Sequence, residues 1–142
     1  MIRRAVLLAC LALLAGAGHT HAQRLDETMD RLAAMWSRGD VRGITGQTVR
    51  SDFALELRAA PSGPVGSRQA AAALRRLFEE GETVSVRPGM TRVVGGTPTR
   101  AFGEMQWVVR PRGTTIPERR TVFVALIRED AGWRITEIRV MP

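Results

Sequence analysis

The chain has 142 residues, a length that fits one domain of ordinary size. Hydrophobic residues make up 44% of it and charged residues 25%, a balance typical of a globular protein and not of a disordered one. All 21 basic side chains are arginine, and the formal net charge is +7. The composition therefore predicts a single basic globular domain, whose only cysteine, Cys10, and only histidines, His19 and His21, lie near the N-terminus.

The first residues have the pattern of a secretory signal peptide. Two arginines give a basic start, and residues 5–17 are apolar or small without a break. This apolar stretch is shorter than the roughly 20 residues that span a bilayer, which disfavours an uncleaved anchor. Cleavage fits best after Ala22, with Ala17 as the second candidate. We expect residues 1–22 to be a signal peptide and residues 23–142 to be one secreted or periplasmic domain without membrane attachment.

The predicted mature chain has neither cysteine, histidine, lysine nor tyrosine. This composition excludes a disulfide, the usual ligand sets for zinc, copper or haem, and the nucleophile pairs Ser-His and Cys-His. Cleavage leaves 19 arginines against 14 acidic residues, a formal charge of +5. Because only carboxylates, arginines, hydroxyls and backbone amides remain, we expect no metal site and no cofactor.

Hydrophobic periodicity predicts helices in the first half of this domain. Apolar residues recur on one helical face between Leu25 and Trp36, ahead of a glycine that ends the helix. A short second helix follows, with Asp40 as its N-cap. A third helix is expected over residues 68–80, where alanine is frequent and Ser67 is a good N-cap.

Strands account for most of the remainder. One is expected between the second and third helices, at residues 51–58. Four more follow the third helix, at residues 83–94 with a break at Pro88-Gly89, then at 99–110, 120–128 and 133–141. The strand at 120–128 is apolar on both faces, which is typical of a central strand. In the last strand the apolar alternation shifts, which predicts a β-bulge near Thr136 and Glu137.

This order of elements predicts an α+β fold. It resembles the nuclear-transport-factor-2-like superfamily, also called the ketosteroid-isomerase-like or cystatin-like cone, and in particular its small exported bacterial members of unknown function. The segments that carry the resemblance are Trp36 to Val41, Ser51 to Phe53, Gly66 to Arg68 and Gly132 to Ile135. The resemblance implies the order α-α-β-α-β-β-β-β, with N-terminal helices packed in the concave face of a curved, mainly antiparallel sheet.

Enzymes of that superfamily place an aspartate base in a conical pocket, but no catalytic residue can be carried over to this chain. The isomerases need a pocket tyrosine and the dehydratases need tyrosine and histidine, which the mature domain lacks. The epoxide hydrolases use an Asp-Arg-Asp arrangement, whereas the late strands here offer Glu104, Arg110, Arg128 and Glu137. We therefore expect a non-enzymatic domain, with a carboxylate- and arginine-only enzyme, epoxide-hydrolase-like or isomerase-like, as the alternative.

Four aromatic side chains and one carboxylate within a strand are the candidates for a ligand pocket: Trp36, Phe53, Glu104, Trp107 and Phe123. Core packing is the competing interpretation for the tryptophans, and exposure or cross-strand pairing for the carboxylate. The resemblance implies that such a pocket takes a small apolar or amphipathic ligand. The strand at 120–128 also leaves an apolar outer face, which predicts a homodimer formed through the sheet.

Four arginines around one connection form the densest basic group: Arg110, Arg112, Arg119 and Arg120. Such a group attracts anionic surfaces, so a basic interaction module for an acidic polymer or partner is the second alternative. A solvated hairpin end is the competing interpretation. No motif indicates specific recognition of nucleic acid.

Export has a direct chemical test. We predict that protein isolated from its native host begins at or near Gln23 in N-terminal sequencing, because a signal peptidase cleaves after the small residue at its site. Leu13→Arg interrupts the apolar stretch and should leave uncleaved precursor in the cytoplasm, whereas the control Leu13→Ile should be processed normally. Soluble cytoplasmic wild-type protein that retains Met1 would refute export.

Overall fold

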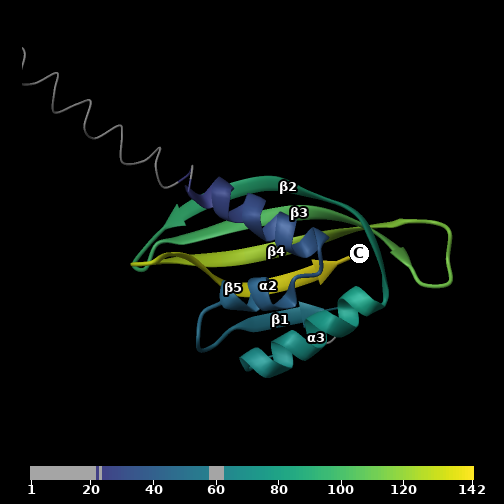
Figure 1. Ribbon diagram of the computed structural model, residues 1–142. Coiled ribbons are helices and arrows are strands. Elements are labelled where there is room, and N and C mark those ends of the chain that lie inside the picture. Colours follow the sequence, from purple (N-terminus) through teal and green to yellow (C-terminus); the bar gives the residue numbers. More distant parts are fainter. Residues whose placement is uncertain (1–21, 23, 58–62) are drawn as a thin grey trace, which may run out of the picture.

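The computed structural model describes residue 22, residues 24–57 and residues 63–142. Helices pack against one face of a curved sheet of five strands (Figure 1). Residues 1–21, and with them nearly all of the predicted signal peptide, lie outside the described residues, so export stays a prediction. Within the described ranges, no helix is both long and apolar enough to cross a membrane.

The helices follow the predicted order. An N-terminal helix over residues 24–37 is followed by α2 (Val41–Gly46) and later by α3 (Ser67–Glu79). Asp40 caps α2 as predicted, because its carboxylate accepts a 2.9 Å hydrogen bond from the backbone N–H of Gly43. The cap of α3 is Gly66 and not Ser67, since the Gly66 N–H donates to the Gln69 side chain at 3.2 Å.

The strands form one mainly antiparallel sheet, which confirms the α+β class. They are β1 (Ala54–Leu57), β2 (Gly81–Gly95), β3 (Arg100–Pro111), β4 (Glu118–Glu129) and β5 (Gly132–Met141). The order across the sheet is β1-β5-β4-β3-β2, and only β1 runs parallel to its neighbour. The N-terminal helix lies over β2 and β3, while α2 and α3 lie near β5 and β1 (Figure 1).

Two strands differ from the prediction. β1 starts at Ala54 and not at residue 51, because Asp52 has a positive φ of 60° that an extended strand does not accommodate. β2 continues through Pro88, where a break was predicted, and the irregularity appears as a shift in pairing between Pro88 and Thr91. β2 is an edge strand, where a proline without an N–H need not interrupt the ladder.

The predicted bulge in the last strand is confirmed. On β4, Ala125 pairs with Glu137 and Leu126 with Ile135, so Thr136 is the extra residue. A bulge of one residue reverses the alternation of the strand after it. The inner face of β5 therefore holds Trp133 and Ile135 before the bulge, and Ile138 and Val140 after it.

The core lies between the helices and the inner face of the sheet, and three aromatic rings form its centre. Trp36 of the N-terminal helix, Phe78 of α3 and Trp107 of β3 meet edge to face, with centroids 5.2, 5.6 and 6.0 Å apart. The indole N–H of Trp107 donates to the Thr83 hydroxyl at 3.0 Å. These rings pack between the helices and the inner face of the sheet.

One glycine lets the N-terminal helix approach the sheet closely. A Cβ placed on Gly103 of β3 would lie 2.7 Å from the sulfur of Met29, which is fully buried. Real Cβ atoms do not come this close, so a larger residue at this position would force the Met29 side chain to move.

The aromatic cluster predicts a stability loss on truncation. Trp107→Ala removes the ring that contacts both Trp36 and Phe78, and we expect it to lower the free energy of unfolding by about 3–5 kcal/mol. A domain of this size has roughly 5–15 kcal/mol in all, so little folded protein should remain at growth temperature. The control is Val84→Ala on β2, 49% exposed, which should cost less than about 0.5 kcal/mol. Urea unfolding measures both, and wild-type stability in Trp107→Ala would contradict the core described above.

Candidate functional site

The five predicted pocket residues do not meet at one site. Trp36, Phe53 and Trp107 are buried in the core, and none of the larger cavities in the described ranges is lined by them. Glu104 of β3 and Phe123 of β4 pair with each other, and their side chains lie on the opposite, outer face of the sheet. The five predicted residues are therefore divided between the core and the outer face of the sheet.

Glu104 and Phe123 line a shallow groove of about 280 Å³ on the outer face. Phe102 of β3 stacks on Phe123, with ring centroids 5.5 Å apart, and Met90 of β2 borders the pair. Arg92 also lines the groove. The sequence analysis does not identify Phe102 and Met90, although an aromatic residue on the mostly polar side of the alternation in β3 is a usable signal.

Exposed hydrophobic side chains gather on two neighbouring strands. Of the six large hydrophobic residues that are exposed in the described chain, one, Ile116, lies in the β3–β4 connection. The other five lie on β2 or β3: Val84, Met90, Val93, Val94 and Phe102. Met90 and Phe102 line the outer groove together with Phe123, and these three residues are called the β2–β3 apolar surface below. Val93 lies instead on the inner side of the sheet, because it pairs with the buried Ala101. A concentration of this kind usually marks an interface.

The β5 side of the outer face is covered instead by an arginine. The guanidinium of Arg139 forms ion pairs with Glu56 of β1 at 2.8 Å and with Glu137 of its own strand at 2.6 Å. It also lies 6.0 Å from the centre of the Phe123 ring. The long side chain thus covers the outer face beside Phe123, whereas Met90 and Phe102 across the groove stay exposed.

The predicted basic group does not form one surface. Arg120 is only 6% exposed, lies 5.3 Å above the ring of Trp107 and pairs with Glu118 at 3.0 Å. Arg110 points to the outer face and pairs with Glu82 at 3.1 Å. Two of the four cations are therefore engaged within the fold, on opposite faces of the sheet.

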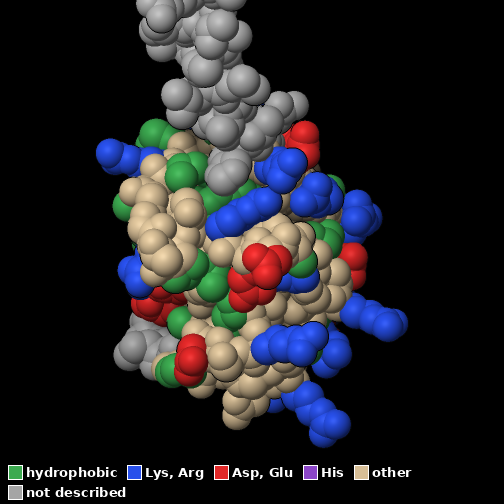
Figure 2. All heavy atoms as spheres, turned by 90° about the vertical axis from the view of Figure 1, so that its left-hand side faces the viewer, with side chains coloured by type: hydrophobic (Ala, Val, Ile, Leu, Met, Phe, Trp, Pro, Cys, Tyr) green, Lys and Arg blue, Asp and Glu red, His purple; other side chains and the backbone are tan. Residues whose placement is uncertain are grey.

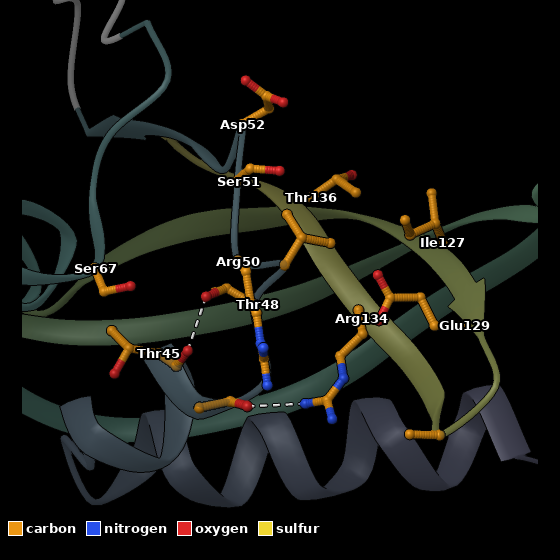
Figure 3. A pocket seen from close by; sticks show the side chains of 13 residues that line it. Thr45, Thr48, Arg50, Ser51, Asp52, Ser67, Ile127, Glu129, Arg134 and Thr136 are labelled. Carbon is orange, nitrogen blue, oxygen red and sulfur yellow. Dashed lines mark hydrogen bonds between the residues drawn. The ribbon is translucent and has the colours of Figure 1, made fainter.

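A polar cleft of about 760 Å³ lies at the end of the sheet where α2 leads into β1, and it is called the edge cleft below (Figure 3). Its walls come from residues 45–52, the start of α3 and the adjoining ends of β4 and β5. Hydroxyl groups dominate the lining: Thr45, Thr48, Ser51, Ser67 and Thr136. No sequence motif indicated this site, because its residues are spread over about 90 positions of the chain.

Backbone bonds hold one wall of the edge cleft against β5. The N–H of Val49 donates to the carbonyl of Ile135, and the N–H of Ile135 donates to the carbonyl of Gln47, both at 2.9 Å. This short parallel bridge lies directly beside Arg134. The segment after α2 is thereby tied to the sheet before β1 begins.

Two arginines enter the edge cleft from different walls. Arg50 comes from the segment after α2 and Arg134 from β5, and both side chains extend toward the C-terminal end of α2 (Figure 3). The guanidinium of Arg134 donates to the carbonyl of Gly46 at 2.9 Å. Among the described residues, neither arginine forms an ion pair with a carboxylate.

Two carboxylates also line the edge cleft. Asp52 stands at its rim and points away from the guanidinium groups, and Glu129 lies at the end of β4 (Figure 3). The end of the molecule that carries the cleft faces the viewer in Figure 2, where basic side chains (blue) are spread over the surface with acidic ones (red) between them. The cleft is thus a polar site with groups of both charges.

The sequence matches no family model and no curated protein. Solved structures do resemble the fold. A conserved protein from Planctomyces limnophilus is 14% identical, with a TM-score of 0.66 over 87% of this chain and 98% of its own. An NTF-2 like protein of unknown function from Shewanella oneidensis is 13% identical, with a TM-score of 0.63 over 84% and 97%.

A DUF4783 family protein from Bacteroides ovatus is similar as well. It is 14% identical, with a TM-score of 0.62 over 77% of this chain and 89% of that protein. At such low identity the likeness extends to the fold alone. Together with the helices on the inner face of a mainly antiparallel sheet, it shows that this chain has the nuclear-transport-factor-2-like fold that its sequence resembles.

Proposed function

We propose that this protein is a secreted or periplasmic, non-enzymatic domain that associates with a second copy of itself through the outer face of its sheet. The observation that carries the proposal is the β2–β3 apolar surface, where Met90, Phe102 and Phe123 line one groove on the outer face and Met90 is 75% exposed. A soluble protein gains free energy by burying such a surface, at about 25 cal/mol for each Å² of apolar area. Export is supported by the signal-peptide pattern of residues 1–22.

The charges around the groove favour a second copy as the occupant. A two-fold interface must be complementary to itself, because the same patch supplies both sides. Arg92 and Glu104 line one groove and carry opposite charges. A two-fold axis through the groove sets Arg92 of each protomer near Glu104 of the other, around a centre formed by Phe102, Phe123 and Met90.

The placement of the candidate catalytic groups supports a non-enzymatic role. Arg110 and Glu137 are engaged in the ion pairs with Glu82 and Arg139 on the outer face. Arg128 lies 5.8 Å above the ring of Trp133. Since these groups make separate contacts, they do not form the compact carboxylate–arginine arrangement that an epoxide hydrolase or isomerase of this fold would need.

A small apolar or amphipathic ligand is the second candidate, and the outer groove is the observation that favours it. The groove has apolar walls from Met90, Phe102 and Phe123. Its volume of about 280 Å³ lies just below the roughly 300–1,000 Å³ of typical small-molecule sites.

Self-association predicts a concentration-dependent mass. Analytical ultracentrifugation of residues 23–142 at roughly 1–100 µM should show a monomer–dimer equilibrium. Met90→Arg places a charge in the apolar surface at a side chain that is 75% exposed, so the fold should tolerate it while dimerisation weakens at least about tenfold. The control is Ile116→Arg, 76% exposed but outside that surface, which should dimerise like the wild type.

Two results would contradict the proposal. One is a monomer mass at every concentration. The other is a dimer that both Met90→Arg and Phe102→Arg leave unchanged, since these two side chains come from different strands of the same surface.

A further inference from the structure

We infer that the edge cleft binds a small polyhydroxylated oxyanion, a sugar-like molecule that carries one carboxylate or phosphate group. This inference is independent of the proposed self-association, because the cleft lies at the β1 and β5 end of the sheet and the apolar surface lies on β2 and β3. Its volume of about 760 Å³ falls within the roughly 300–1,000 Å³ of small-molecule sites.

Arg50 and Arg134 define the end of the cleft that would hold the oxyanion. Each guanidinium presents a planar fork of N–H donors that matches the geometry of a carboxylate or phosphate. Two cations that extend toward the same end without a described carboxylate partner repel each other, and an anion between them would relieve that repulsion. An anion is therefore the occupant that this arrangement favours.

Arg134 is held in place before any ligand arrives. One of its N–H groups bonds to the carbonyl of Gly46, and the neighbouring Ile135 is paired with the segment Gln47 to Val49. The remaining donors of the guanidinium are available to a ligand, because a single hydrogen bond uses one of five. Such preorganisation lowers the entropy lost on binding.

The rest of the lining favours a ligand with hydroxyl groups over an apolar acid. Five side-chain hydroxyls line the cleft, and each can both donate and accept hydrogen bonds. Asp52 and Glu129 can accept hydrogen bonds from ligand hydroxyls, but they would repel a ligand that carries many negative charges. Among the larger side chains of the lining, only Val49 and Ile127 are apolar. A molecule with one oxyanion and several hydroxyls satisfies this set.

Calorimetric titration of residues 23–142 with four probes tests the ligand class. The probes are glucuronate, glucose 6-phosphate, glucose and inorganic phosphate. We expect glucuronate, glucose 6-phosphate or both to bind at least about tenfold more tightly than glucose and inorganic phosphate, because only they offer the oxyanion and the hydroxyls together. The ratio between the two tells a carboxylate from a phosphate ligand.

Single substitutions test the residues. Arg50→Ala should weaken binding of the preferred probe at least about tenfold, and Arg50 is exposed, so folding should be unaffected. Arg134→Ala should weaken it similarly, with its melting temperature measured in parallel because the bond to Gly46 is also lost. The matched control is Arg42→Ala, an exposed arginine on α2 outside the cleft lining, which should bind like the wild type.

Three outcomes would overturn the inference. The first is the absence of binding by all four probes at about 10 mM. The second is an equal loss in Arg42→Ala and Arg50→Ala, which would mean general attraction to a basic surface. The third is inorganic phosphate binding as tightly as glucose 6-phosphate, which would leave the hydroxyl-lined part of the cleft without a role.

Discussion

The edge-to-face contact of Trp36, Phe78 and Trp107 is the interaction on which the rest of the structure depends. It joins the N-terminal helix, α3 and the centre of β3, three elements that are far apart in the sequence. These rings occupy the concave side of the sheet and belong to the packed core between it and the helices. The cavities lined by strand ends and by the outer face of the sheet lie outside this core.

The outer face is divided by one charged network. Arg139 links β1, β5 and the ring of Phe123, so the outer face is covered by a polar layer on that side. On the other side, Phe102 and Met90 have no such cover and remain exposed. The outer face of the sheet therefore carries ion pairs over β1 and β5 and an apolar groove over β2 and β3.

Much of the edge cleft is formed by the segment that connects α2 to β1. After α2 the chain is pinned to β5 by the bonds of Val49 and Ile135, and Asp52 then turns it with a positive φ into β1. This path places Arg50 and Arg134 on facing walls although 84 positions separate them in the sequence. Loops held by a rigid scaffold are common positions for binding residues. The segment between α2 and β1 is such a loop, because its backbone is bonded to β5.

The sequence by itself determined the elements and their order. The helix from Leu25 to Trp36, the central β4 and the bulge at Thr136 follow from periodicities of neighbouring residues, and these depend on local backbone geometry and burial on one face. Only the tertiary structure decided that Trp36 and Trp107 meet in the core, that Glu104 and Phe123 face outward, and that Arg50 and Arg134 line one cleft. Those outcomes depend on which strands pair and how the helices dock, and contacts between distant residues leave no periodic signal in a single sequence.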